Sequence, residues 1–533
     1  MLLLFISIIG LLILNFGVGL IINNILKTQS QSFVLISFLG ILSITFLQTI
    51  IAFFSPLNIF IESFFLIVGL VGFLIYSKKK DFSYFDFKKN INFWFFFFVV
   101  IILFIGSFSP YLYDHYSYYV PTISMLREVG FVKGVSNLDL LLGQSSFWHI
   151  YQAGFSNILD GFLRANSYLL ILFLIYVYER KQWILLIFIP FFLLLIQQPS
   201  PDLPTFTIAL IVLNELLNNT DRKLLLYFSI FTFCIKPILF WLPLLILSES
   251  IYKRNFKFQI LIPLAAFGVL FIIKNIWLFG FPVFPISVFD FNLPWKPSPE
   301  LLTYSSQIGL MKSYDMHYSY QQILDFNFLE RIYHWFTIGV KSVFNLGIVL
   351  SVLILAFLAF RKKDKFYTLL FICALIKFIL IIIFSAQYRF FIDIYLITLF
   401  LILKNISEEK ATFISVVFSV LISVIFTFPS FVKGKFHMGK WMAGFQMSQL
   451  IKPTEFKSEH PKSYQLGNLK FSATKGLIDK TQFPAISLYW LKTYKYYNIF
   501  SQISDNGFIQ RKLTEKEKVE LGEIIKDLEN SRP

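Results

Sequence analysis

Long apolar runs recur along the whole chain and are separated by short polar stretches. A helix needs roughly 20 residues to cross the hydrocarbon of a bilayer, and 14 runs come near that length. They cover residues 2–24, 33–54, 59–76, 92–109, 165–179, 183–197, 204–218, 224–236, 237–250, 258–276, 335–359, 366–385, 389–404 and 411–429. Only 15% of the residues are charged, which no soluble globular class shows. The sequence therefore predicts an all-α membrane protein, a polytopic bundle of about 14 transmembrane helices.

Basic clusters in the short loops orient these spans. They lie at Lys78–Lys80 with Lys88 and Lys89, Arg180–Lys181, Arg222–Lys223, Lys253–Lys257 and Arg361–Lys365. All of these clusters fall on one face of the membrane if the chain turns back at Lys236-Pro237. A single span over 224–250 would instead place the Lys253 cluster on the opposite face. The positive-inside rule makes the shared face cytoplasmic. Because the Ile-, Lys- and Asn-rich composition also suggests a bacterial source, we expect a multi-pass protein of the bacterial inner membrane with its C-terminus outside.

The opposite face then holds the long polar segments. These are the outer loops 110–164 and 277–334 of a transmembrane domain 1–429, and a polar C-terminal segment 430–533. In that segment Thr514 and Glu517 have the spacing of a capping box, and apolar residues recur at helical spacing from Leu521 to Leu528. We expect a soluble extracytoplasmic domain here; a tail bound to anionic headgroups is the alternative.

Two acidic residues lie at the predicted outer rim. Asp114 follows the fourth span, beside His115 and among tyrosines, and ionisable groups at membrane depth usually mark a pathway or a reaction centre. Asp114 is therefore a candidate general base, with a helix cap as the structural alternative. His115 is either a partner of Asp114 or a surface residue. Asp202 stands between prolines, where it can cap the next helix or line a polar cavity.

Three cations lie at the outer ends of predicted helices: Lys236, Lys274 and Arg389. One such residue is commonly a snorkelling side chain, but three on the face of Asp114 suit a phosphate or diphosphate. For Arg389 an intrahelical pair with Asp393 competes with that role. Lys377 lies within an apolar run, and the sequence shows no partner for it.

Several short motifs, in this order and on one predicted side, resemble bacterial polytopic membrane proteins related to the GT-C class of glycosyltransferases. They are Tyr113-Asp114-His115-Tyr116, Gly130-Phe131-Val132-Lys133-Gly134, Gly143-Gln144-Ser145-Ser146-Phe147-Trp148, Ser200-Pro201-Asp202-Leu203-Pro204, Lys274-Asn275 with Gly280-Phe281-Pro282, and Tyr388-Arg389-Phe390.

The resemblance implies a GT-C-like helical bundle that takes a sugar from a polyprenyl-phosphate carrier on the outer face, with Asp114 as the essential acidic residue. The residues it implies in substrate binding are His115, Gln144, Trp148, Asp202, Lys236, Lys274, Asn275 and Arg389. At this position the chain has Asp114-His115, whereas a pair of acidic residues would suit a metal. The chain offers no ligand motif for a divalent metal, so we expect no metal and no other cofactor.

We therefore expect a membrane glycosyltransferase that transfers a sugar from a polyprenyl-phosphate-linked donor to a glycan, lipid or protein acceptor of the cell envelope. The alternatives are a transporter or flippase of lipid-linked saccharides, and a protein like an O-antigen polymerase or ligase. The net charge of +16 does not indicate nucleic-acid binding, because much of it lies in short loops between apolar runs. Cys234 and Cys373 lie in apolar runs and are expected to be buried core residues.

Overall fold

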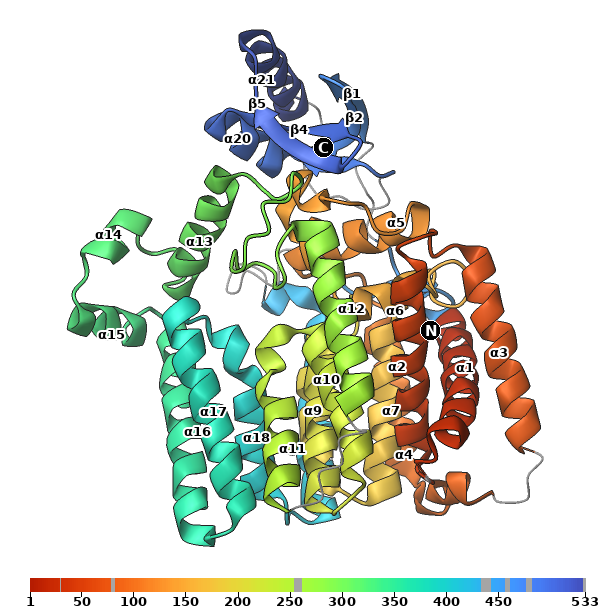
Figure 1. Ribbon diagram of the computed structural model, residues 1–533. Coiled ribbons are helices and arrows are strands. Elements are labelled where there is room, and N and C mark those ends of the chain that lie inside the picture. The colour runs from red at the N-terminus through yellow and green to blue at the C-terminus, as the bar shows by residue number, and fades with distance from the viewer. Residues whose placement is uncertain are drawn as a thin grey trace. The chain divides into compact units, whose positions relative to one another are not determined.

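The computed structural model describes residues 1–533 except 29, 78–81, 254–260, 433–441, 456–460, 476–481 and 531–533. It is mostly helical (Figure 1). Seven of the described helices are long and apolar enough to cross a membrane: α1 (Leu2–Leu26), α2 (Phe33–Ile51), α3 (Ile59–Ser77), α12 (Leu261–Phe279), α16 (Lys341–Lys362), α17 (Lys365–Phe384) and α19 (Glu408–Thr427). An eighth results if α4 (Phe93–Gly106) and the bent segment before it, η1 (Phe82–Asn90), form one span.

The other predicted runs form helices shorter than a span. They are α7 (Ala165–Arg180), η5 (Trp183–Phe188), α8 (Ile189–Leu193), α9 (Asp202–Leu217), α10 (Arg222–Ile235), η6 (Pro237–Leu239), α11 (Trp241–Tyr252), η8 (Tyr388–Phe391) and α18 (Ile392–Leu403). Each of the 14 runs thus contains a helix, but only seven to eight have spanning length where about 14 were predicted. Prolines explain part of the shortening, because a helix-interior proline removes a hydrogen bond and clashes with the preceding turn. Pro190 and Pro237 lie at such breaks.

The chain divides into two compact units. Unit 1 comprises Met1–Pro204, Val269–Ser298 and Ile406–Pro533, and unit 2 comprises Thr205–Gly268 and Pro299–Asn405. In unit 1, α1 packs closely on α2 and α3 (Figure 1). The approach needs glycine, since a Cβ on Gly17 would lie 1.9 Å from the carbonyl oxygen of Gly69.

The loop between α4 and α7 is folded and anchored to the spanning helices of unit 1. It contains η2 (His115–Tyr119), α5 (Val120–Glu128), η3 (Val135–Asn137), η4 (Leu140–Gln144) and α6 (Phe147–Ala153). α6 packs against α2 and α5. Glu62 on α3 accepts hydrogen bonds of 2.7–2.9 Å from three successive N–H groups, those of Asn157, Ile158 and Leu159. A buried carboxylate that is satisfied in this way fixes the end of the loop.

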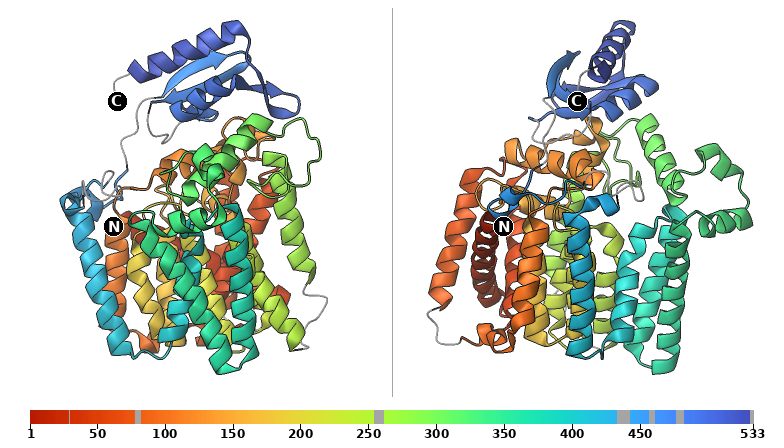
Figure 2. Two further views of the ribbon diagram at one scale, coloured as in Figure 1. Left: turned by 90° about the vertical axis from the view of Figure 1, so that its left-hand side faces the viewer. Right: turned by 180° about the vertical axis from the view of Figure 1, so that it is seen from behind.

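The C-terminal segment combines short strands with two helices. After η9 (Pro429–Phe431) and η11 (Met447–Leu450), strands β1 (Lys462–Leu466), β2 (Leu469–Thr474) and β3 (Ala485–Ser487) form one sheet in that order, and β4 (Ile499–Ser504) pairs with β5 (Gly507–Lys512). α20 (Leu488–Tyr497) and α21 (Glu515–Asn530) accompany them (Figure 2). The predicted capping box is confirmed, because Glu517 N–H donates to Thr514 Oγ1 at 3.3 Å and Thr514 N–H to Glu517 Oε2 at 3.0 Å.

This segment packs directly on the loop between α4 and α7. Asn137 Nδ2 donates to the carbonyl oxygen of Phe508 at 2.8 Å, and Tyr494 Oη donates to that of Leu138 at 2.8 Å. Gly507 has a φ of 90°, and a Cβ there would lie 2.2 Å from the carbonyl oxygen of Lys133. The contact therefore depends on a backbone conformation that glycine adopts without strain.

In unit 2, α10 and α11 pack against each other after the break at Lys236-Pro237, as the two-helix interpretation predicted. α16 and α17 lie side by side (Figure 1). The segment before them contains α13 (Pro299–Ser313), α14 (Tyr320–Asp325) and α15 (Phe328–Phe336). Cys234 and Cys373 are both buried, as predicted. The predicted basic residues Lys78–Lys80 and 254–257 and the aromatic Trp441 lie outside the described residues.

Candidate functional site

Asp114 precedes a turn of π-helix. In η2 the N–H of Val120 donates to the carbonyl oxygen of His115, five residues back, so the turn holds one residue more than an α-helical turn. Single π-turns of this kind frequently occur at functional sites. The side chain of Asp114 is half-buried, whereas that of its neighbour His115 is buried.

The structure places Asp114 and Asp202 where both of their charges act on the phenol of Tyr119. Tyr119 is buried, and burial raises its pKa well above the usual range. The nearby side chains of Tyr118, Asp114 and Asp202 raise the pKa further, and a hydrogen bond with Ser200 opposes them. Two carboxylates from distant segments thus share an electrostatic effect on one tyrosine. The sequence predicted both acidic residues for the site but did not predict Tyr119 as their common neighbour.

Asn166 holds the turn that carries Asp202. Its Nδ2 donates to the carbonyl oxygens of Gln198 and Ser200 at 2.8 and 3.0 Å. Trp148 Nε1 donates in turn to Asn166 Oδ1 at 2.8 Å, and the Trp148 side chain is fully buried. In this structure Trp148 therefore orients the turn through Asn166, and its ring presents no open face to a substrate.

Asp139 is a further carboxylate of this region that the sequence interpretation missed. Its Oδ1 accepts from Leu141 N–H at 2.9 Å, and burial raises the pKa of Asp139 to about 7. The charges of Asp139 and Asp114 both raise the pKa of Tyr113, after burial as the larger cause. In the sequence Asp139 has only the pattern of an ordinary turn residue, and its position beside Tyr113 depends on tertiary packing.

His149 packs against the ring of Tyr119. The two ring centroids are 5.0 Å apart, and the imidazole has no exposed surface. Burial lowers the pKa of His149 to about 3, so the ring is neutral near pH 7. A neutral imidazole carries one donor and one acceptor, which suits it to orienting polar groups rather than to holding charge.

Lys274 and Asn275, both on α12, tie chain segments together. Lys274 Nζ donates to the carbonyl oxygens of Gln144 and Ser145 at 2.9 and 2.8 Å. Asn275 Nδ2 donates to the carbonyl oxygen of Pro282 at 2.8 Å. Gln144 takes part through its main chain. Through these contacts Gln144, Lys274 and Asn275 hold segments of the chain together. Their role in substrate binding stays a prediction.

Residues 1–396 match the model of a family described as Domain of unknown function (DUF8201). The chain belongs to this family. No curated protein and no solved structure matches the chain. The DUF8201 match includes every residue gathered around Tyr119, whereas the strands of the C-terminal segment lie beyond it.

In unit 2 the DUF8201 match also covers the predicted cations Lys236 and Arg389. Both lie next to the ring of Phe390, with Lys236 Nζ 5.8 Å and Arg389 Cζ 5.1 Å from its centroid. The predicted competitor for Arg389, Asp393, accepts two hydrogen bonds of 2.5 and 2.6 Å from Lys377 Nζ. It also accepts one of 2.7 Å from Trp241 Nε1.

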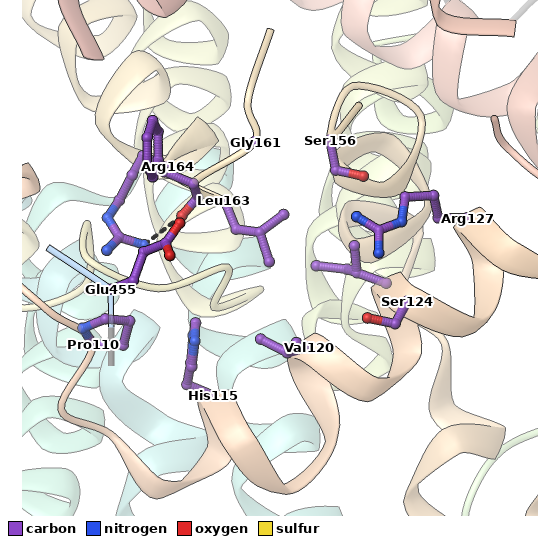
Figure 3. A pocket seen from close by; sticks show the side chains of 12 residues that line it. Pro110, His115, Val120, Ser124, Arg127, Ser156, Gly161, Leu163, Arg164 and Glu455 are labelled. Carbon is purple, nitrogen blue, oxygen red and sulfur yellow. Dashed lines mark hydrogen bonds between the residues drawn. The ribbon is translucent and has the colours of Figure 1, made fainter. Parts of the chain in front are cut away.

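A small cavity lies beside the π-helical turn at His115 (Figure 3). Its polar lining consists of His115, Ser124, Arg127, Ser156, Arg164 and Glu455, and its volume is about 60 Å³. The DUF8201 match contains all of these residues except Glu455. The neighbouring residues Asp114 and His115 therefore have different surroundings. The charge of Asp114 acts on Tyr119, whereas His115 lines the cavity. Among the described residues no group of three or more His, Cys, Asp or Glu side chains could hold a metal ion.

Proposed function

We propose that the chain is a membrane glycosyltransferase that transfers a sugar from a polyprenyl-phosphate-linked donor to a cell-envelope acceptor. The observation that supports this most directly is that the charges of Asp114 and Asp202, from distant segments, both act on Tyr119. A half-buried carboxylate beside aromatic side chains can accept the proton of an incoming hydroxyl, provided that the hydroxyl comes within hydrogen-bond reach. Asp114 is the base in this proposal, and Asp202 and Tyr119 orient the acceptor or the donor sugar.

The donor phosphate needs cations, because negative charge develops on the leaving group in the transition state. Lys236 and Arg389 are the candidates, since both lie beside Phe390 in unit 2. The proposal includes a GT-C-like bundle of about 14 spans in the bacterial inner membrane, with the C-terminal domain outside. It requires no metal.

A variant of Asp114 tests the base directly. Deletion of the gene should cause the lipid-linked donor to accumulate, and expression of wild-type protein should reverse the accumulation. Asp114→Asn keeps the size of the side chain but removes the proton acceptor, so transfer should fall about 10²–10⁴-fold.

Asp505→Asn is the matched control, since Asp505 is an exposed carboxylate at the tip of the β4–β5 hairpin. Normal transfer by abundant Asp114→Asn protein would remove Asp114 as the base and direct attention to Asp202.

Reporter fusions test the orientation. A phosphatase fused after residue 533 should be active, because that enzyme folds only outside the cytoplasm, and a fluorescent protein fused there should be dark. The reverse pattern would place the C-terminal segment and the loop packed against it on the cytoplasmic side.

One observation favours the alternative of a transporter or flippase. Lys377 lies inside the spanning helix α17 and is paired with Asp393, and both are buried. Charged residues inside spanning segments often line ion or substrate pathways. A flippase would leave the lipid-linked sugar on the cytoplasmic face when the gene is deleted, whereas a transferase would leave it on the outer face.

A further inference from the structure

The cavity beside His115 is built from three parts of unit 1. α5 contributes Ser124 and Arg127, the turn before α7 contributes Ser156 and Arg164, and the segment after η11 contributes Glu455. Figure 3 shows His115, Arg127 and Glu455 directed toward one space, with the carboxylate of Glu455 facing the guanidinium of Arg164.

Arg164 is a fixed wall of this cavity. Its guanidinium donates to the carbonyl oxygens of Gly106, Phe162, Phe108 and Thr454 at 3.0, 2.6, 3.2 and 3.2 Å. Thr454 N–H donates to the carbonyl oxygen of Ser107 at 2.8 Å, which holds the residue before Glu455 in place. The position of Glu455 at the cavity therefore results from an anchored backbone.

Arg127 and His115 supply two further polar side chains to the lining of the cavity. The Arg127 side chain is 38% exposed, and its contact with Glu128 is long at 3.9 Å. His115 is 4% exposed, and its Nδ1 has no hydrogen-bond partner among the described residues. Burial, helped by the charge of Arg164, holds the pKa of His115 well below its usual range, so the ring is neutral. The His115 ring lines the cavity, and a buried ring nitrogen without a protein partner is a rare arrangement that calls for an explanation, such as a ligand.

We propose that this cavity binds one monosaccharide unit through its hydroxyl groups, and that this unit belongs to the acceptor. The charges of the lining argue against the other ligand classes. A phosphate would meet the carboxylate of Glu455, and an ammonium group would meet two guanidinium groups. Sugar hydroxyls both donate and accept, so they can satisfy Glu455, Arg127 and the two serines together.

The size of the cavity fits this ligand. Its 60 Å³ correspond to roughly four to six water molecules, which is about the space that one sugar ring with its hydroxyls displaces. Val120, Ile123 and Phe162 supply the apolar part of the lining. The assignment to the acceptor rests on the proposed function, because the cavity-lining His115 directly follows the proposed base Asp114 in the chain.

The test is direct binding to the purified full-length chain in nanodiscs. Saturation-transfer NMR would use methyl glycosides of a neutral hexose and of an N-acetylhexosamine, with inorganic phosphate and ethanolamine as the competing probes. We expect binding of at least one glycoside and no competition by phosphate. Glu455→Gln and Arg127→Gln should each weaken binding about 10-fold, since each removes a hydrogen bond to a charged group.

Glu523→Gln, an exposed carboxylate on α21, is the matched control, and Arg127→Lys separates loss of the guanidinium fork from loss of charge. Two results would overturn the inference. One is phosphate binding that becomes stronger in Glu455→Gln, and the other is that folded wild-type protein binds no glycoside. Glycoside binding by a protein that transfers no sugar would uphold the cavity and reject the transferase. If transfer depends on Asp114 but tolerates Arg127→Gln and Glu455→Gln, the transferase would be upheld and the cavity would be rejected as the acceptor site.

Discussion

Two groups of buried charges in this protein are satisfied in different ways. In unit 2, Lys377 and Asp393 are 0% and 2% exposed, and Trp241 donates to the same carboxylate. In unit 1, Asp114 and Asp202 are half-buried beside one tyrosine, and the nearby His115 has a ring nitrogen without a partner among the described residues. A saturated charge pair has little capacity left for a ligand. The half-buried carboxylates of unit 1 remain accessible to a ligand, so unit 1 is the better candidate for a reaction site.

Breaking the saturated pair should have the largest effect on stability. Lys377→Met leaves Asp393 buried without its cation, and such a loss typically costs about 3–5 kcal/mol. We expect a much lower melting temperature in detergent. Lys377→Met combined with Asp393→Asn should recover most of it, because the amide oxygen still accepts from Trp241. Lys363→Met, at an exposed position after α16, is the control. Wild-type melting of the single variant would mean that the pair is kept for transport.

Tyr119→Phe tests the site in unit 1, where we expect a larger effect on transfer than on stability. The change removes the hydroxyl whose pKa both carboxylates raise, and leaves the buried ring in place. We expect transfer to fall about 10-fold, as for the loss of one hydrogen bond, with a much smaller change in melting temperature than in Lys377→Met. Tyr496→Phe, at a residue that is 82% exposed, is the control. A severe loss of stability without a change in transfer would make Tyr119 a packing residue.

Asp139 makes stability depend on pH. Burial raises the pKa of Asp139 from 3.8 to about 7, so the folded state favours the protonated form. Its contribution to stability is therefore complete below about pH 4 and declines as the pH rises toward 7. The melting temperature of the wild type should fall over this range relative to that of Asp139→Asn, in which the group does not titrate. Parallel curves for the two proteins would show that Asp139 is ionised in the folded state.

The pair of Arg511 and Glu517, in which Arg511 is half-buried and Glu517 is buried, should give the smallest effect. Glu517 also belongs to the capping box of α21, and Arg511 holds the pKa of Glu517 at about 2. Glu517→Gln should cost about 1 kcal/mol or less and should not change transfer. Thermal melts beside Glu523→Gln would show this. A larger loss would mean that the C-terminal segment supports the site in unit 1 through its contact at Asn137.

Sequence patterns predicted the helices well, because each long apolar run is a local property of the chain. They also predicted the capping box at Thr514 and the break at Lys236-Pro237, which depend on neighbouring residues. They overestimated the number of spanning helices, since several runs that include polar or proline ends form helices shorter than a span.

The site was predicted less completely, because its contacts join distant segments. Asp114 and Asp202 were chosen for their position at the rim, and they do share a neighbour. Trp148, Lys274 and Asn275 were chosen from motifs, and in the structure each holds another segment of the chain. Asp139, His149 and Glu455 look ordinary in the sequence. A polar residue that reaches a site only through tertiary packing carries no periodic signal.

The extra residue at His115–Tyr119 is taken up within a single turn, because Val120 N–H reaches the carbonyl oxygen of His115, five residues back. Deleting Ser117 would leave the spacing of an ordinary α-helical turn, with α5 in nearly the same orientation. The side chains within the turn would change direction instead, because each would lie about 100° from its neighbour. A one-residue deletion here would therefore redirect the side chains of the turn and leave Arg127 and Ser124 on α5 almost where they are.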